Sequence, residues 1–411
     1  MNYKKIAVLL TWWFIKRDKK NLFDSVIDAL IRIISILIFP LIWILLFTIS
    51  PLIKIKFIFL YRERLGHLIA NTDFFIREQK INPAKKTYFL TLCHNPANKT
   101  VVEIFSQVLH VISNEYAFKL MSAFGVFENR FRQSIPFAVD NHIRFRVPSP
   151  FSFSKSQIKA GDKLFEAMGI RKQDWYVTFH ARDNAFDNQI SGSNENYNKM
   201  ASYRNADISK YQGAVSLVLK SGGKAIRVGF PVESAVKFTD DSLYDYSLSK
   251  FRSDFADVWV CANSRFMVTT ANGIAEIPEM FDVPVIMVNT VPIGAYPLGV
   301  NCLYLPKILA KKNGEPLPFS EQLKYFAEFE IAANRFVLDA IHSDGLMLKD
   351  NTDQQLTHVT QEMLNRLSGQ WVPKSGYYDR LADLSECYKK FGGHGVPLTP
   401  MGEDFLFELV L

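Results

Sequence analysis

The sequence contains few cysteines, and they lack the spacings found in disulfide-rich or zinc-binding proteins. Its four cysteines lie far apart in apolar or helical surroundings, with no C-x-x-C pair: Cys93, Cys261, Cys302 and Cys387. Isolated cysteines of this kind are typical of buried thiols in a reducing compartment. The sequence therefore predicts neither a disulfide framework nor a zinc site.

Three motifs for phosphate or metal binding are also absent. The chain has no G-x-x-x-x-G-K-[ST] and no G-x-G-x-x-G, which excludes a kinase-type P-loop and a standard dinucleotide fingerprint. It has no D-x-D triplet, the carboxylate pair that holds a metal ion in many enzymes that use nucleotide sugars. Because no residue pattern requires Mg²⁺, we expect neither a metal ion nor a cofactor.

Length and charge set broad limits on the kind of protein. A chain of 411 residues is longer than a single hydrophobic core usually organises, so two domains are expected. Hydrophobic residues make up 48% and charged residues 22%, which is typical of a globular protein. The net charge of +7 fits an anionic membrane surface, whereas no aromatic-basic motif supports nucleic-acid binding.

A long apolar run covers residues 33–53 without a single charged side chain. It is long enough to cross a bilayer as a helix, so we expect membrane association. Lysines and arginines flank the run on both sides, which favours a segment that enters and returns at the cytoplasmic face, with a bend near Pro40. Residues 21–32 would then form an amphipathic lead-in within the interface. A simple spanning helix and a buried core helix are the alternatives.

Beyond this run, short strands alternate with helices. Strand-like runs cover residues 56–61, 87–92, 176–179, 224–228, 258–261, 266–269 and 284–288. Helical spacing covers residues 101–112, 156–168 and 209–220 and part of 273–281. This alternation predicts an α/β fold with parallel, doubly wound sheets, whose ligands bind at the carboxyl ends of the strands.

The most informative polar cluster follows the strand at residues 176–179. His180, Arg182 and Asp183 come directly after that strand, and Arg204 and Asn205 follow a polar loop. An imidazole, a guanidinium and a carboxylate are thereby delivered to the edge of the sheet where ligands bind. The alternative is a solvated turn with a local ion pair.

A second loop, residues 269–273, suggests phosphate binding. It joins a buried strand to a helix start, where free backbone N–H groups and hydroxyls would face an anion, unless its side chains simply cap the helix. Arginines nearby could add bidentate contacts to a diphosphate. We assign these residues to the binding of a nucleotide sugar: His180, Arg204, Asn205, Arg227, Gly229, Thr269, Thr270, Asn272, Gly273 and Glu276.

Two of the candidate side chains each have an ordinary structural explanation as well. Glu276 could accept hydrogen bonds from ribose or sugar hydroxyls, or it could only complement the helix dipole. His67 follows Gly66 at the end of the first strand and could be the general base for an acceptor hydroxyl, or a packing or capping residue. The catalytic candidates are His67, Arg182 and Asp183.

Four runs of the chain resemble those of a bacterial family of glycosyltransferases found among surface-polysaccharide genes. They are residues 64–68, 179–183, 204–208 and 266–273, and residues 305–307 and 350–353 are also similar to that family. The resemblance spans residues 57–370. One departure is Ala271-Asn272-Gly273, where the family has Ser-Ser-Gly, so this chain offers no serine hydroxyl at that point.

The resemblance implies the two-domain architecture called GT-B, in which two Rossmann-like domains face a cleft and the C-terminal one holds most of the nucleotide sugar. The expected parts are a membrane-associating segment (1–54), an acceptor domain (55–170), a nucleotide-sugar domain (171–375) and a C-terminal helical segment that crosses back to the first domain (376–411).

These lines together predict a glycosyltransferase that needs no metal ion and acts at the cytoplasmic face of the inner membrane. It would move a sugar from a nucleotide-diphosphate sugar to a lipid-linked glycan acceptor in surface-polysaccharide or lipopolysaccharide synthesis. Arg182 and residues 269–273 would stabilise the leaving phosphate, and His67 or Asp183 would be the base if the reaction inverts configuration. A nucleotide-sugar epimerase of the same fold and a non-catalytic membrane scaffold are the alternatives.

Overall fold

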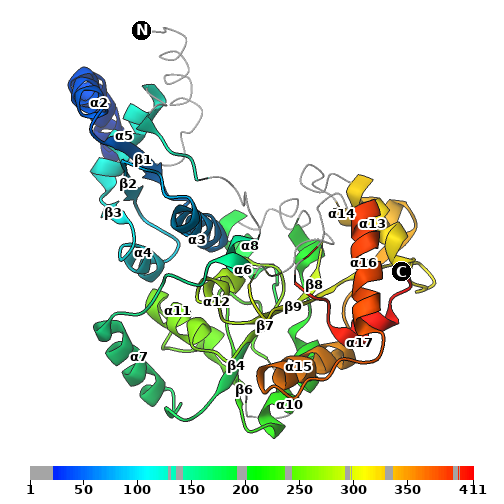
Figure 1. Ribbon diagram of the computed structural model, residues 1–411. Helices are drawn as coiled ribbons and strands as arrows, with labels where there is room; N and C mark the ends of the chain where they lie inside the picture. Colours follow the sequence, from blue (N-terminus) through cyan, green and yellow to red (C-terminus); the bar gives the residue numbers. More distant parts are fainter. Residues whose placement is uncertain are drawn as a thin grey trace. The chain divides into compact units, whose positions relative to one another are not determined.

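The computed structural model describes residues 22–127, 131–135, 142–191, 201–236, 243–291, 297, 299–328, 337–391, 397 and 399–411. The chain divides into two compact units, residues 1–139 (unit 1) and residues 140–411 (unit 2). Figure 1 shows the elements of each unit. Both units contain a parallel β-sheet with helices, which confirms the predicted α/β class.

Unit 1 is built around the parallel sheet β1-β2-β3. Its elements are α2 (Leu22–Ile49), β1 (Lys54–Phe59), α3 (Leu65–Ile81), β2 (Thr87–Cys93), α4 (Lys99–Phe105), β3 (His110–Ser113) and α5 (Glu115–Phe127). A parallel bridge from Phe57 to Arg132 adds a segment on the side of β1 away from β2. The strand order therefore reverses beside β1, as in one half of a doubly wound sheet.

The apolar run lies mostly in α2, and this helix continues through Pro40. The bend expected at Pro40 therefore does not divide the segment into two helices. Leu46 of α2 belongs to a buried cluster with Phe57 and Leu92, and Ile42 packs against the same cluster.

Within the described part of the chain, none of the helices combines the length and the apolar character needed to cross a membrane.

Unit 2 is organised by a six-stranded parallel sheet in the order β6-β5-β4-β7-β8-β9. The strands are β4 (Tyr176–His180), β5 (Lys224–Arg227), β6 (Leu243–Asp245), β7 (Met267–Thr269), β8 (Val285–Thr290) and β9 (Leu303–Pro306). A separate antiparallel pair is formed by β10 (Ile308–Lys311) and β11 (Leu346–Lys349). The central strands β4, β7 and β8 are almost completely buried, as their continuous apolar sequences predict.

Helices and short 3₁₀ turns surround this sheet. The helices of unit 2 are α6 (Ile143–Arg146), α7 (Lys155–Ala167), α8 (Ala185–Ser191), α10 (Gln212–Lys220), α11 (Asp254–Ala262), α12 (Glu276–Met280), α13 (Phe319–Glu328), α14 (Val337–Ser343), α15 (Asp353–Leu367), α16 (Tyr377–Phe391) and α17 (Glu403–Glu408). The 3₁₀ turns are η2 (Ser202–Arg204), η3 (Ile208–Tyr211), η4 (Tyr246–Leu248) and η5 (Gly273–Ala275).

Two predicted elements differ from the structure. Residues 258–261, predicted as a strand, belong to helix α11, which the Ser253 side chain caps by accepting the N–H of Ala256. The helix predicted for residues 101–112 ends at Phe105, and the later residues form β3. The short apolar run at 258–261 fits helix and strand equally well, and at 101–112 the apolar spacing of the helix continues without a break into the next strand.

The domain boundary also differs from the expectation. Residues 140–170 belong to unit 2, where Phe153 and Phe165 contact the Trp259 ring of α11. At the other end of the chain, α16 packs against α13 and α17 packs against α15. The C-terminal segment is therefore part of unit 2, and its expected crossing to the first domain remains a prediction.

Candidate functional site

In unit 2 the chain order of the strands reverses between β4 and β7. In space β5 and β6 lie on one side of β4, and β7, β8 and β9 lie on the other. Parallel sheets with this order bind ligands, dinucleotides among them, in the crevice outside the strand ends at the point of reversal. The loops at this switch point follow β4 and β7, and they are the two loops that the sequence singled out.

One hydrogen bond joins the two loops directly, and others hold the second loop in shape. The backbone N–H of Arg182 donates to the Oγ1 atom of Thr270 at 3.1 Å. The Asn272 amide donates to Oγ1 of Thr269 at 2.9 Å and to the carbonyl of Thr270 at 2.6 Å. Both threonines are fully buried. The prediction that their hydroxyls face an incoming anion is therefore wrong, and they hold the two loops in shape instead.

The helix start after β7 is capped by its own side chain. The Asn272 Oδ1 atom accepts the backbone N–H of Ile274 at 3.0 Å and that of Ala275 at 3.3 Å, and the 3₁₀ turn begins at Gly273. These two N–H groups are already satisfied, contrary to the expectation that they are free for an anion. The capping alternative is thus confirmed for Asn272.

The Arg182 guanidinium is almost fully buried in a local network. It donates to the Asp187 carboxylate on α8, to the side-chain oxygen of Asn205 and to the carbonyl of Ala201. Burial, followed by the positive charge of Arg204, lowers the pKa of Arg182, and Asp187 opposes that shift. This geometry makes Arg182 a support for the loop of residues 201–205.

Arg204 lies close enough to Arg182 to influence its charge, and it has no acidic partner among the described residues. Its Nε atom is buried without a hydrogen-bond partner, and its guanidinium lies 5.7 Å from the ring centre of Tyr203. Arg182 is paired with Asp187, so among the described residues Arg204 is the positive charge beside the switch point that lacks an acidic partner. A partly buried cation whose Nε donor is unsatisfied among the described residues is a suitable contact for an anionic ligand.

Lys307 at the end of β9 was not among the residues assigned from the sequence. Its Nζ atom donates to the carbonyl of Asn205 at 2.7 Å and forms an ion pair with Asp350 at 2.7 Å. Asn205 is therefore held by Lys307 through its backbone and by Arg182 through its side chain. The sequence feature that could have identified Lys307 is its position directly after a buried strand.

His180 and Gly229 connect the ends of β4 and β5. Because a carbonyl oxygen can only accept, the Nδ1–H of His180 must donate to the Val228 carbonyl, at 2.9 Å. Burial lowers the pKa of His180 to about 4, so its ring is neutral at pH 7. Gly229 has a φ angle of +112°, and a Cβ atom there would lie 2.3 Å from the imidazole. Both residues therefore shape the edge of the sheet.

Asp183 and Arg227 are occupied by local contacts. The two Asp183 oxygens each accept a backbone N–H, from Ala185 at 3.0 Å and from Glu233 at 2.9 Å. Arg227 donates to Asp245 on β6 at 3.1 Å and is buried. Neither side chain is placed as the sequence reasoning expected, because each one joins neighbouring loops or strands.

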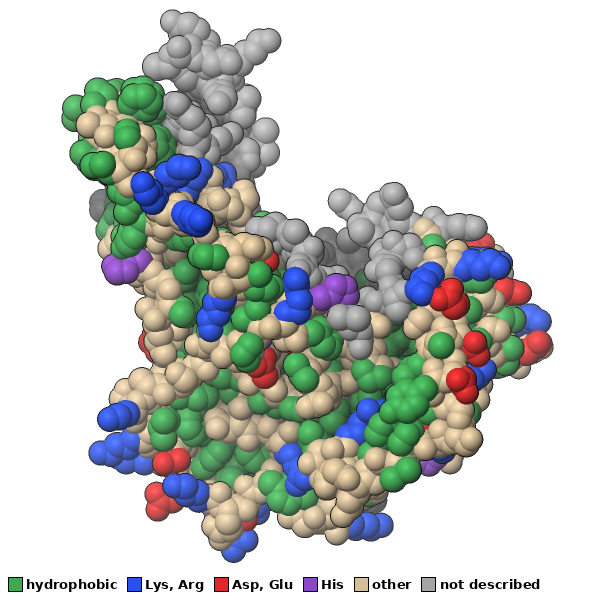
Figure 2. All heavy atoms as spheres, in the orientation of Figure 1, with side chains coloured by type: hydrophobic (Ala, Val, Ile, Leu, Met, Phe, Trp, Pro, Cys, Tyr) green, Lys and Arg blue, Asp and Glu red, His purple; other side chains and the backbone are tan. Residues whose placement is uncertain are grey.

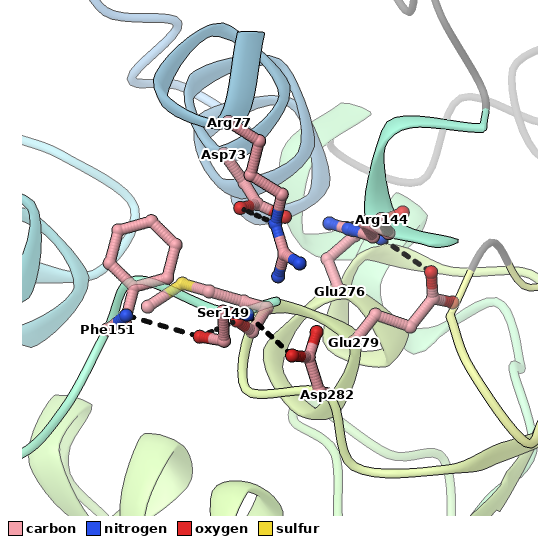
Figure 3. Close-up of polar contacts among 9 residues, drawn as sticks. Asp73, Arg77, Arg144, Ser149, Phe151, Glu276, Glu279 and Asp282 are labelled. Atoms are coloured by element: carbon pink, nitrogen blue, oxygen red, sulfur yellow. Dashed lines mark hydrogen bonds and ion pairs between the residues drawn. The ribbon is translucent and has the colours of Figure 1, made fainter. Parts of the chain in front are cut away.

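Glu276 forms an ion pair at the start of α12. Arg144 of α6 donates to Glu276 at 2.9 Å and to Glu279 at 2.5 Å (Figure 3). The backbone N–H of Ser149 also donates to Asp282, just beyond α12, at 2.5 Å. Arg144 and Glu279 are buried, while Glu276 keeps some exposure. The pairing favours a structural role for Glu276 over recognition of a ribose.

In unit 1 two histidines follow the strand ends. His67 lies in the first turn of α3, after β1, with its ring centre 6.3 Å from that of Tyr61. Burial, followed by the charge of Arg64, lowers the pKa of His67, so the ring is neutral at pH 7 and able to accept a proton. His94 follows β2, and its Nε2 atom lies 3.8 Å from the Glu115 carboxylate. The sequence reasoning gave His94 no role, although it follows a predicted strand.

No protein-family model matches this chain. No curated protein matches it either.

The chain is similar to several solved structures at low identity. The glycosyl transferase family 9 structure from Veillonella parvula DSM 2008 is 8% identical, with 76% of this chain and 97% of that chain covered and a TM-score of 0.46. E. coli ADP-heptose lps heptosyltransferase II is 12% identical, with coverages of 77% and 99% and a TM-score of 0.43. E. coli heptosyltransferase WaaC with ADP is 14% identical, with coverages of 67% and 97% and a TM-score of 0.32. With TM-scores below 0.5, these likenesses establish neither the fold nor the activity of this chain.

Two further observations concern the rest of the molecule. A cavity of about 410 Å³ lies away from the switch point and is lined in part by Phe145, Arg366 and Trp371. The Arg366 guanidinium lies 3.5 Å from the Trp371 ring centre, so this cavity borders a packed cation–π pair. Among the residues that the structure describes, no group of His, Cys, Asp or Glu side chains could hold a metal ion.

Proposed function

We propose that the protein transfers a sugar from a nucleotide-diphosphate sugar to an acceptor hydroxyl. The observation that carries the proposal is Arg204 beside the switch point of unit 2, where the strand order reverses and a positive charge lacks an acidic partner among the described residues. A diphosphate has the complementary charge and can accept several hydrogen bonds from one guanidinium.

The proposed roles at this site follow the contacts. Arg204 binds the diphosphate and stabilises the negative charge that develops on the leaving phosphate. Arg182 and Lys307 are positioning residues, because both hold Asn205, the neighbour of Arg204 in the chain. We propose no metal ion in this step, since the sequence lacks the D-x-D carboxylate pair.

The acceptor side is assigned to unit 1. We propose His67 as the general base, since a neutral imidazole after β1 lies beside the reversal of strand order in that sheet. The apolar helix α2 in the same unit supports a lipid-linked glycan acceptor at the cytoplasmic face of a membrane. This acceptor fits synthesis of a surface polysaccharide or lipopolysaccharide.

Nucleoside diphosphate binding tests the donor site. Thermal unfolding of the full-length protein is measured with and without ADP, UDP, GDP and CDP, because a ligand that binds only the folded state raises the midpoint. One of them should stabilise the wild type and Arg171→Gln, an exposed arginine control. Arg204→Gln should bind that nucleotide about 10-fold or more weakly, since charged hydrogen bonds are lost. Equal affinity would remove Arg204 from the site, and no binding by the wild type would refute the proposal.

Product analysis then identifies the reaction. Transfer requires an acceptor, whereas an epimerase would convert the donor without one. His67→Gln should abolish transfer and leave nucleotide affinity unchanged. An active His67→Gln variant together with an inactive His94→Gln variant would place the base at His94.

A further inference from the structure

Helix α2 has two apolar stripes, and among the described residues of unit 1 only one of these stripes has packing partners. The first stripe is partly or fully buried, and its members are spaced by three, four or seven residues: Ile31, Ile38, Ile42, Leu46 and Ile49. This spacing places them on one face of the helix. Through Ile42 and Leu46 this face joins the core cluster that includes Phe57 of β1 and Leu92 of β2.

The second stripe is exposed and consists of large apolar side chains. Its members are Leu30, Ile33, Ile34, Leu37, Leu41, Ile44, Leu45 and Phe47, each between 49% and 70% exposed. At 1.5 Å per residue the stripe is about 26 Å long. Leu52 and Ile53 continue it beyond the end of the helix. Hydrophobic side chains accordingly gather over α2 in Figure 2.

Such a stripe is not typical of a helix on a water-facing surface. A helix that is apolar on all sides is normally buried in a core or in lipid, and large contiguous apolar patches mark sites where another surface binds. On a helix that faces water these exposed positions would carry polar residues. In α2 they carry leucine, isoleucine and phenylalanine.

Basic side chains lie directly beside the exposed stripe. Lys54 begins β1 immediately after Ile53, and its backbone N–H donates to the carbonyl of Lys86 at 2.7 Å. Lys54, Lys85 and Lys86 are all exposed, and none has an ion pair within the described residues. Figure 2 shows Lys and Arg side chains gathered where β1 begins, next to α2. An apolar surface bordered by lysines has the complementary chemistry of an anionic lipid leaflet.

We infer that α2 lies in the plane of an anionic membrane surface, with its exposed stripe in the leaflet and Lys54, Lys85 and Lys86 against the lipid headgroups. A spanning helix would contact hydrocarbon on all sides over about 30 Å. This arrangement does not fit α2, because Ile42 and Leu46 are packed into the core of unit 1. The inference rests on the proposed membrane location, and it specifies which face of unit 1 meets the lipid.

Flotation with vesicles tests the surface. The full-length protein is mixed with phosphatidylcholine vesicles with or without phosphatidylglycerol, and the fraction that floats is measured. Leu37→Asp/Leu41→Asp should abolish flotation. Lys54→Gln/Lys85→Gln/Lys86→Gln should weaken binding to the anionic vesicles on the order of 100-fold, because each lysine contributes about fivefold. The matched controls are Val372→Asp and Lys155→Gln/Lys159→Gln/Lys163→Gln, which change exposed residues of unit 2.

Depth measurements distinguish a helix in the plane from one that crosses. Nitroxide labels are attached to Leu30→Cys, Leu37→Cys and Ile44→Cys in a Cys387→Ser background, since the other three cysteines are buried. Similar shallow depths at all three positions are expected. A depth that changes steadily along the helix would overturn the inference, as would flotation of Leu37→Asp/Leu41→Asp at the wild-type level.

A second copy of the chain is the other occupant to be tested. A lipid-free dimer that becomes a monomer in Leu37→Asp/Leu41→Asp, with no vesicle binding by the wild type, would assign the stripe to self-association and overturn the inference. The same variant should keep wild-type affinity for the nucleoside diphosphate. The failure of the membrane inference is thereby separated from failure of the proposed donor site.

Discussion

At the scale of single residues, Arg182 and Arg204 have the same functional group in different surroundings. Arg182 neutralises Asp187, whose side chain is only 6% exposed. Arg182→Ala would remove the guanidinium from this buried ion pair, so we expect unfolding to become easier by about 3–5 kcal/mol.

Urea denaturation of the full-length protein measures this effect. Arg171→Ala removes a guanidinium that is 71% exposed, and its partner Asp174 keeps Lys224, so the loss of stability should be much smaller. Adding Asp187→Asn to Arg182→Ala should recover part of the loss, because the buried negative charge is then removed together with its guanidinium. Wild-type stability of Arg182→Ala would show that its guanidinium is not needed for the loop and is available for a ligand.

His180 connects stability with pH. Its folded-state pKa of about 4 lies below the value of about 6.5 expected in the unfolded chain. The unfolded state therefore binds the proton first as the pH falls, and the folded state loses stability between about pH 6.5 and pH 4. Since the ring is not completely shielded from water, we expect this histidine to account for about 1–2 kcal/mol of the difference between pH 7 and pH 4.5. Urea titrations at both pH values should show a smaller difference in unfolding free energy for His180→Gln than for the wild type. An equal difference in the two proteins would contradict the assignment to His180.

At the scale of elements, the packing of α7 on α11 depends on a glycine. A Cβ atom at Gly161 would lie 2.0 Å from the Trp259 ring, which Phe153, Phe165 and Phe255 also contact. Alanine is favoured over glycine in a helix by about 1 kcal/mol, but overpacking costs about 1–3 kcal/mol. We therefore expect Gly161→Ala to lower stability or leave it unchanged, although the same change usually stabilises a helix. The control in the same urea assay is Lys159→Ala, on the exposed face of α7. A clear gain in stability for Gly161→Ala would show that α7 does not pack closely against Trp259.

The sequence could locate strand ends, but it could not show which side chains meet there. The runs that became β4, β5 and β7 are apolar and lie between polar or glycine-containing segments, so their loops could be assigned to the ligand edge. Residues 258–261 of α11 were misread because an apolar, β-branched run has no distinguishing period. The Ser253 cap and the acidic first turn of α11 were the signals that could have corrected it.

The partners of the site residues depend on the tertiary fold. Lys307 contacts the carbonyl of Asn205 across 102 positions of sequence, and Arg144 contacts Glu279 across 135. No local pattern predicts such contacts. The sequence therefore placed Arg182 in the loop that follows β4, but it could not distinguish a supporting arginine from one that is available for a ligand.

At the scale of the whole molecule, the division at residue 139 can be tested with fragments. Residues 140–411 contain the complete six-stranded sheet, α7 and the Arg144 partner of Glu279. A fragment that starts at residue 171, the boundary predicted from the sequence, lacks α7 and leaves Glu279 buried without Arg144. Loss of a buried ion-pair partner costs about 3–5 kcal/mol, so the shorter fragment should unfold at a clearly lower urea concentration.

The two fragments also test where the donor site is complete. Every contact proposed for the diphosphate and its supports, from Arg182 to Lys307, lies within unit 2. Fragment 140–411 should therefore unfold cooperatively and bind the same nucleoside diphosphate as the full-length protein, with an affinity within about threefold, because independent sites usually change by less than 0.5 kcal/mol. Nucleotide binding by the full-length chain alone would mean that unit 1 contributes contacts to the donor. Equal stability of the two fragments would support the domain boundary at residue 170 that the sequence predicts.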